Sequence, residues 1–169
     1  MQILIIRKLR RAFAFSASLN SMYLEVHPSP SPMTIQYWLV KTEPEAYSWE
    51  TFVKEKRTDW TGVRNYQARN YLKAMRKGDR VLFYASVTTK AVLGITEVTK
   101  TAFPDVTTEE SGWVAVELKA DVAFPQPVSL AQIKAEPSLK NMALLRQSRL
   151  SVMSLTSAEF KKITALGCA

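Results

Sequence analysis

RVLFYASVTTKAVLGITEVTKTAF (residues 80–103) contains two runs rich in β-branched and aromatic residues, separated by a short polar turn. Such runs are typical of β-strands, and we predict strands over Arg80–Ser86 and Ala91–Phe103. A third run, WVAVELKADVAF (Trp113–Phe124), alternates strongly between apolar and polar residues and predicts another long strand. Three long neighbouring strands predict a curled sheet.

Shorter elements are predicted on both sides of these strands. Ile35–Lys41 is aromatic and β-branched and predicts a strand, and Ser48 is expected to cap the helix that follows. Asn65 is expected to cap a second helix, which Gly78 ends. The remaining predicted elements are a short helix over Ser129–Ala135, a strand over Arg149–Leu155, and a helix that begins with a capping box of Thr156 and Glu159 and ends at Gly167. This order predicts an α+β fold, a small barrel with helices packed outside.

Residues 1–32 differ in composition from the rest of the chain. They contain a basic run, RKLRR, followed by alternating prolines. We expect either an Arg-rich targeting peptide or an upstream extension of a chain that starts at Met33. The extension is favoured, because the apolar MQILII precedes the basic run, which is the wrong order for a secretory signal. We therefore predict a disordered or non-native extension over 1–32, a single domain over 33–169, and a protein that is not secreted.

Composition excludes several kinds of chemistry. The chain has 169 residues and a formal net charge of +8, which favours an anionic partner, with nucleic acid ahead of a membrane. A soluble basic surface is the alternative. Cys168 is the only cysteine, so one chain cannot form a disulfide framework or a multi-cysteine zinc site. His27 is the only histidine and lies in the proline-rich segment, which argues against a His-based triad or metal site. We expect no cofactor and no metal.

Positive charge is concentrated between Lys54 and Arg80, where nine basic residues accompany three acidic ones. Lys and Arg side chains bind the phosphates of a nucleic acid without regard to its sequence. Arg69, Lys73 and Arg76 of the predicted second helix are candidates for such contacts. A solvated helix face would have the same charge.

Aromatic and amide side chains lie close to these charges. An aromatic ring near a loop or strand end can stack on a base, and an amide can hydrogen-bond to the edge of a flipped base. Trp38 in a strand could instead be a core residue, and Asn65 only a helix cap. The candidates are Trp38, Trp60, Tyr66 and Tyr84 among the aromatic residues and Asn65, Gln67 and Asn70 among the amides.

A second group of polar residues follows the predicted strands. Lys41 and Thr42 end the first strand and could supply donors to a carbonyl or phosphate, and Ser86 ends a later one. Ser148 and Arg149 could line the same cavity. Thr42 and Ser86 could equally be ordinary turn residues.

Four motifs occur in a fixed order: WLVKTEP (38–44), WTGVRNYQARN (60–70), KGDRVLFYAS (77–86) and RQSRLSVMSLT (146–156). With these motifs the chain resembles the EVE domain family over about residues 35–166. The resemblance implies a PUA-like curled β-barrel related to YTH domains. It also implies a pocket that accepts a modified base, often a modified cytosine, extruded from DNA or RNA.

The resemblance assigns roles to individual positions. The implied base pocket consists of Trp38, Lys41, Thr42, Trp60, Val63, Arg64, Asn65, Tyr84 and Ser86. The implied contacts to the nucleic-acid backbone are Arg69, Lys73, Arg76 and Arg149. Two positions depart from the family pattern. Ala85 stands where the third motif usually has His, and Ser154 stands where the last motif usually has Pro.

Three functions follow as hypotheses. The first is a binding module for a modified, flipped base, with no metal and no membrane partner. The second is an enzyme acting on nucleic acid, with Asp59, Asp79, Glu43 or Lys41 as acid, base or metal ligand. The third is a scaffold with a vestigial pocket. We expect a cytoplasmic protein, or a nuclear one in a eukaryote.

Overall fold

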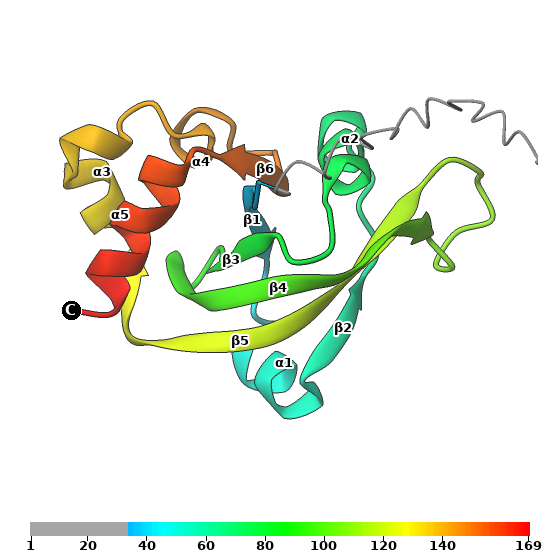
Figure 1. Ribbon diagram of the computed structural model, residues 1–169, viewed down its shortest axis with the longest axis horizontal. Helices are drawn as coiled ribbons and strands as arrows, with labels where there is room; N and C mark the ends of the chain where they lie inside the picture. Colours follow the sequence, from blue (N-terminus) through cyan, green and yellow to red (C-terminus); the bar gives the residue numbers. More distant parts are fainter. Residues whose placement is uncertain (1–33) are drawn as a thin grey trace, which may run out of the picture. The chain divides into compact units, whose positions relative to one another are not determined.

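The computed structural model describes residues 34–169, so the predicted extension over 1–32 lies outside the described residues. Figure 1 shows the arrangement of the elements. The strands are β1 (Tyr37–Thr42), β2 (Arg57–Trp60), β3 (Arg80–Ala85), β4 (Ala91–Pro104), β5 (Val114–Ser129) and β6 (Val152–Leu155). The helices are α1 (Trp49–Glu55), α2 (Tyr66–Ala74), α3 (Leu130–Ala135), the 3-10 turn η1 (Pro137–Leu139), α4 (Ala143–Arg146) and α5 (Ser157–Gly167).

All six strands form one mixed sheet in the order β2-β5-β4-β3-β1-β6. β1 and β3 are parallel, and the other neighbours are antiparallel. Register shifts along the β4–β5 pair bend these two long strands, which run across the molecule in Figure 1. The α+β class and the curled sheet are confirmed. The sheet remains open, however, because β2 and β6 are its two edges, so hydrogen bonding does not close the predicted barrel.

Helix caps explain where most helices begin. Ser48 and Asn65 accept hydrogen bonds from the backbone N–H groups of Thr51 and Ala68, as predicted. The capping box of Thr156 with Glu159 is also confirmed. The predicted end of the second helix at Gly78 is wrong, because α2 already ends at Ala74. The caps not yet named are Ser129, which forms a capping box with Gln132 at α3, and Met142 at α4.

The strands differ from the predictions in several places, and β1 begins at Tyr37, two residues later than predicted. β2 was not predicted, because RTDW has no apolar alternation and forms a strand only through its pairing with β5. β5 continues beyond Phe124 through Pro125 and Pro127, which fall where the β4–β5 register shifts and a missing donor is tolerated. β6 is shorter than predicted, since Arg149–Ser151 precede its first residue.

The core lies between the curled sheet and its helices. Figure 1 shows α3 and α5 at one end of the sheet, α1 beside β2, and α2 and α4 near β6. Trp49 and Phe52 of α1 pack against Phe83 of β3 with ring centroids 5.1 and 5.8 Å apart. The Trp49 indole packs directly over Gly94 of β4, where an added Cβ would lie 2.4 Å from the ring. No helix within residues 34–169 is long and apolar enough to cross a membrane.

Candidate nucleic-acid interface

A cavity of about 360 Å³ lies where the sheet fails to close. We call it the seam cavity, because it is lined both by Trp60 at the end of edge strand β2 and by Ser151 directly before edge strand β6. It unites six of the nine predicted pocket residues with Arg149. Its lining residues are Lys41, Thr42, Trp60, Thr61, Gly62, Val63, Arg64, Asn65, Arg149 and Ser151.

Backbone pairing at the strand ends shapes the rim of this cavity. β1 and β3 are parallel, so their carboxyl ends lie at the same edge of the sheet. The Lys41 N–H donates to the Ser151 carbonyl over 2.8 Å. The Ser86 N–H and its hydroxyl both donate to the Thr42 carbonyl, each over 2.8 Å. The rim is therefore held by main-chain atoms of β1, β3 and the segment before β6.

Asp105, directly after β4, holds the loop between β2 and α2. Its Oδ2 accepts from the Gly62 N–H over 2.9 Å and from Arg64 Nη1 over 2.7 Å, while Arg64 Nη2 donates to the Thr107 hydroxyl. The side chain of Asp105 is fully buried. Burial alone would raise the pKa of Asp105, but the hydrogen bonds from Thr107, Arg64 and Gly62 outweigh burial and hold the pKa well below its usual range. Asp105 therefore stays charged and fixes the Arg64 guanidinium.

Asn65 is a helix cap that also lies at the seam cavity, so its predicted contact to a base stays a prediction. Its Oδ1 accepts the Ala68 N–H over 3.0 Å and so caps α2. Asn65 also lines the seam cavity. The cap thus fixes the orientation of a side chain that faces the cavity.

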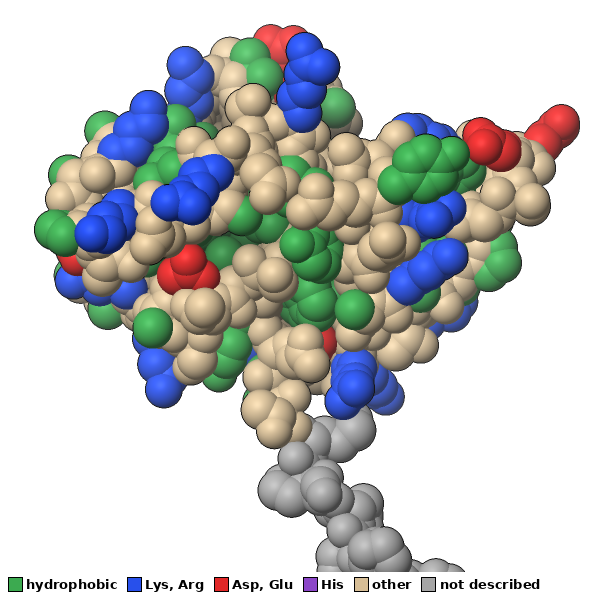
Figure 2. Space-filling model, turned by 90° about the horizontal axis from the view of Figure 1, so that it is seen from above, with side chains coloured by type: hydrophobic (Ala, Val, Ile, Leu, Met, Phe, Trp, Pro, Cys, Tyr) green, Lys and Arg blue, Asp and Glu red, His purple; other side chains and the backbone are tan. Residues whose placement is uncertain are grey.

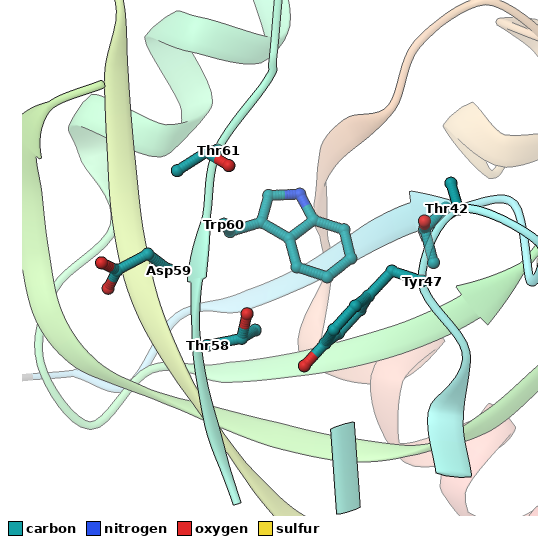
Figure 3. Close-up of a pocket in the computed structure, with 7 residues that line it drawn as sticks. Thr42, Tyr47, Thr58, Asp59, Trp60 and Thr61 are labelled. Carbon is teal, nitrogen blue, oxygen red and sulfur yellow. The ribbon is translucent and has the colours of Figure 1, made fainter. Parts of the chain in front are cut away.

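Trp60 forms the wall between the seam cavity and a second cavity of about 360 Å³, which we call the Tyr47 cavity. In Figure 3 the indole projects from β2 toward Tyr47 and Thr42, whereas Asp59 points to the other side of the strand. Trp60 is only 8% exposed and packs edge-on against Phe83 at 6.0 Å. It is therefore a core residue with one accessible edge, not the open platform that its loop position predicts.

The hydroxyl of Tyr47 is held beside this wall. It donates to Glu55 Oε2 over 2.7 Å, and burial together with that carboxylate raises the pKa of Tyr47 to about 12. Tyr47 stays neutral and remains a hydrogen-bond donor at physiological pH. The Tyr47 cavity shares Thr42, Trp60 and Thr61 with the seam cavity and is otherwise lined by Ala46, Tyr47, Thr58 and Asp59.

Trp38 does not belong to the pocket, which corrects the assignment that the resemblance implies. It is 2% exposed, lines neither the seam cavity nor the Tyr47 cavity, and donates from Nε1 to Asp79 Oδ2 over 2.9 Å. Asp79 also accepts from the backbone N–H groups of Gln36 and Arg76. Trp38 is a core residue because its single polar atom is satisfied inside the protein.

Tyr84 and Ser86 line a different cavity, of about 350 Å³, in which Lys41 is also present. Lys41 therefore lies between this cavity and the seam cavity, and its Nζ donates to the Ser148 carbonyl. Burial lowers the pKa of Lys41, with Glu43 opposing that effect, and burial raises the pKa of Tyr84. The other lining residues are Glu43, Val87, Lys90, Leu130, Leu144 and Ser148.

The predicted backbone contacts have different surroundings. Arg149 lines the seam cavity and also a shallower cavity of about 270 Å³ that it shares with Arg146 and Gln67. Lys73 and Arg76 are exposed and line none of the four cavities. Arg69 is half-buried, with its guanidinium over two aromatic rings, so it is not the freely exposed phosphate contact that its helix position predicts.

The seam cavity is cationic. Lys41, Arg64 and Arg149 are among its ten lining residues, and no acid is. Figure 2 shows Lys and Arg side chains on both halves of one face of the molecule, with hydrophobic side chains visible in the hollow between them. Cations around a concave, partly apolar site favour a ligand that is both anionic and aromatic.

The partners of two buried acids, Asp105 beside the seam cavity and Asp79 in the core, could not be assigned from the sequence. Asp105 lies 43 positions after Gly62 and 41 after Arg64, and Asp79 lies 41 after Trp38. Asp105 does follow a strand and a proline, which indicates a turn but does not say what the carboxylate contacts. The parallel pairing of β1 with β3 places Asp79 beside Trp38, and the contact of Asp105 with the loop before α2 likewise joins segments far apart in the sequence.

Residues 36–166 match the family model described as the EVE domain. This chain belongs to the EVE domain family. Thymocyte nuclear protein 1 of Gallus gallus is 32% identical, over 80% of this chain and 70% of that protein. The crystal structure of protein Atu2648 from Agrobacterium tumefaciens has a TM-score of 0.76 and 43% identity, and covers 78% of this chain and 92% of that one.

A solved complex extends the comparison to a ligand. The crystal structure of human THYN1 protein in complex with DNA that contains 5-methylcytosine has a TM-score of 0.73 and 31% identity. The match covers 78% of this chain and 97% of the human one. The EVE fold predicted from the four motifs is thereby confirmed.

Proposed function

We propose that this EVE domain binds DNA carrying a modified base, with 5-methylcytosine as the first candidate, and that the base leaves the duplex to enter the seam cavity. The observation that carries the proposal is the seam cavity itself, where three cations and no acid surround polar groups and the edge of an indole. The complex of human THYN1 with 5-methylcytosine DNA supports the same ligand class.

The lining residues divide into two groups by chemistry. Lys41, Arg64 and Arg149 match the negative charge of the phosphates that flank an extruded base. Trp60 and Val63 offer apolar contacts, and a 5-methyl group is the apolar feature that distinguishes 5-methylcytosine from cytosine. The polar edge of the base requires donors and acceptors, which Thr42, Thr61, Asn65 and Ser151 supply.

The preference for the methylated base is expected to be moderate. One methyl group in an apolar environment changes the free energy of binding by about 1–3 kcal/mol, which corresponds to roughly 10- to 200-fold in affinity. Much of the total affinity then comes from phosphate contacts that any DNA makes.

We further propose a binding module, not an enzyme. Asp79, one of the four residues considered for catalysis, is 2% exposed and accepts hydrogen bonds from three donors. Asp59 lines the Tyr47 cavity but not the seam cavity, and its carboxylate points to the side of β2 opposite to the Trp60 indole (Figure 3). A binding module needs neither carboxylate to be free.

The test is a titration of the protein with duplex oligonucleotides that differ only at one cytosine, which is unmodified, 5-methylated or 5-hydroxymethylated. The full chain is used, and binding is followed by fluorescence anisotropy at fixed salt. We expect tighter binding to a modified duplex, and a single-stranded RNA of the same sequence tests the RNA alternative. Equal affinity for all cytosine forms would contradict the proposal.

Matched charge variants locate the site. Arg149→Ala removes a cation from the seam cavity, whereas Lys161→Ala removes one from the exposed face of α5. We expect Arg149→Ala to weaken binding of the methylated duplex clearly more than Lys161→Ala. An equal effect of the two variants would indicate general charge attraction without use of the seam cavity.

A further inference from the structure

Tyr66 is a large aromatic residue that the fold leaves in water. Its side chain is 64% exposed. The recognition of 5-methylcytosine proposed above does not involve it. Tyr66 is the first residue of α2 and lies between Asn65 and Gln67, which line the seam cavity and the neighbouring shallow cavity. An exposed aromatic ring beside such a cavity can stack on a base.

The ring of Tyr66 is held in place. It lies 5.1 Å from the ring of Trp113 with an interplanar angle of 33°, and the Arg69 guanidinium lies 4.8 Å from its centroid. Trp113 itself is buried, and the guanidiniums of Arg69 and Arg64 lie 5.3 and 5.6 Å from its centroid. A ring fixed in this way loses little conformational entropy when a second ring stacks on it.

The same cluster connects Tyr66 to the seam cavity. Arg64 lines that cavity and also contacts Trp113, so the rings share one cation with the cavity wall. Nε of Arg69 is buried and has no hydrogen-bond partner among the described residues, because the guanidinium is positioned against the two rings. Leaving a buried N–H without a partner costs free energy. This arrangement is consistent with an Arg69 side chain that holds the rings of Tyr66 and Trp113 in place.

We propose that Tyr66 stacks on the nucleobase next to the extruded one. Extruding a base breaks its stacking with its neighbours, and an aromatic side chain can replace one of those lost contacts. Tyr66 has the exposed ring, the fixed orientation and the surrounding positive charge that this role requires. This inference rests on the proposed function, because it assumes that the modified base enters the seam cavity.

The test compares three forms of the full chain, wild type, Tyr66→Phe and Tyr66→Ala, on the 5-methylcytosine duplex. Each form is titrated with the normal duplex and with duplexes that have an abasic site on either side of the modified base. Base stacking on an aromatic side chain is worth roughly 5- to 150-fold in affinity. We expect Tyr66→Ala to lose that factor on the normal duplex, and Tyr66→Phe to keep the wild-type affinity.

The abasic duplex separates stacking from other effects. For one of the two abasic positions, Tyr66→Ala and wild type should bind with nearly equal affinity, because the stacking partner is absent. Binding of 5-methyl-deoxycytidine monophosphate, followed by protein NMR, should be the same for both forms. If Tyr66→Ala binds the normal duplex as tightly as wild type, or loses the same factor on every DNA and on the mononucleotide, the stacking role is wrong.

The proposed function can fail separately from this inference. If wild type binds all cytosine forms equally, the modified base is not recognised and both proposals fall. If wild type prefers the methylated duplex and Tyr66→Ala retains full affinity, only the stacking role falls.

Discussion

At the scale of single residues, Asp105 has the largest influence on the site without lining it. Its carboxylate is the shared acceptor for the Gly62 N–H and the Arg64 guanidinium, and it also accepts from the N–H and hydroxyl of Thr107. Four donors around one buried carboxylate create a positive field that an uncharged side chain would not balance. The position of the loop that walls the seam cavity depends on this charge.

Asp105→Asn is expected to lower the free energy of unfolding by about 2–3 kcal/mol, because a buried charge-assisted network loses its charge and the new amide group faces donors. Urea denaturation measures the change. Asp121→Asn is the control, since Asp121 is exposed and pairs with Arg80 at the surface, where an ion pair contributes less than about 1 kcal/mol. Similar losses in the two variants would contradict the role of Asp105.

The same carboxylate predicts an acid-sensitive contribution to stability. The pKa of Asp105 in the folded protein lies well below its usual range, whereas an unfolded Asp titrates near about 3.9. A depressed folded pKa contributes stability above the unfolded pKa, and this contribution is lost as the pH falls from about 4 toward the folded pKa. The difference in unfolding free energy between wild type and Asp105→Asn should therefore shrink below about pH 4. A constant difference from pH 6 to pH 3 would contradict it.

Residue types alone could not show which tryptophan lines a cavity and which lies in the core. Trp38 and Trp60 both stand beside strand ends and polar motifs, yet Trp38 is satisfied by Asp79 and Trp60 shows one edge to two cavities. The distinction depends on which way each side chain points from a curled sheet. That orientation is set by pairing between distant strands, which short sequence patterns do not contain.

At the scale of elements, α2 joins folding to the site through one residue. Asn65 caps the helix and lines the seam cavity, so its substitution should affect both stability and DNA affinity. Replacing it with Ala or with Asp separates these two effects. Tyr66, Arg69 and Lys73 all depend on the same helix for their positions.

Asn65→Ala removes the cap and is expected to lower the free energy of unfolding by about 1 kcal/mol. Asn65→Asp keeps an acceptor for the Ala68 N–H and should retain wild-type stability, while it places a negative charge beside Arg64 and Arg149. Asn65→Asp should therefore bind DNA more weakly than wild type while its melting temperature stays close to that of wild type. Thermal melts and anisotropy titrations of both variants provide the comparison. Wild-type DNA affinity in Asn65→Asp would place Asn65 outside the site.

The contact of α1 with the sheet depends on the absence of a side chain at Gly94. An added Cβ would lie 2.4 Å from both the Trp49 ring and the Val122 carbonyl oxygen, so Gly94→Ala should destabilise the protein by at least about 2 kcal/mol. Thr101→Ala, at an exposed position on the same strand, is the control and should change stability little. Urea midpoints that coincide for the two variants would exclude a tight α1–β4 contact.

Element types were predictable where local chemistry is strong. The caps at Ser48, Asn65 and Thr156 and the long strands β3, β4 and β5 follow from side chains within a few residues of each element. β2 was not predictable, because four residues with the sequence RTDW become a strand only by adding to the edge of β5. This missed strand carries Trp60, so the sequence placed the main site tryptophan in a loop.

At the scale of the whole molecule, positive charge becomes informative where the structure locates it, with Lys41, Arg64 and Arg149 around the seam cavity. The resemblance grouped nine pocket residues, and the structure brings six of them together with Arg149 around one opening. Tyr84 and Ser86 lie in the adjoining cavity beyond Lys41. The four motifs in order thus predicted the fold, but not how the motif residues are shared between adjoining cavities, and their contacts to a base stay a prediction.

Salt dependence should distinguish a phosphate contact from a contact to the base. Lys73→Ala is expected to weaken binding to methylated and unmethylated duplexes alike and to reduce the slope of log K against log salt by about 1, because Lys73 is exposed and lies outside the four cavities. Val63→Ala is the comparison, since Val63 lines the seam cavity without carrying charge. It should alter the preference for the methyl group and leave the slope unchanged. An unchanged slope in Lys73→Ala would remove Lys73 from the phosphate contacts.

Because the sheet is open, a ligand in the seam cavity should change the rate at which its edge strands open and exchange amide hydrogens. Edge strands exchange their amide hydrogens readily, because one side of each strand has no partner, and the cavity is lined from both edges, by Trp60 of β2 and by Ser151 before β6. A ligand that contacts both edges would connect β2 to the segment before β6. Hydrogen exchange should then slow in β2 and β6 together on DNA binding, although the two strands are almost a hundred positions apart in the chain and share no hydrogen bond.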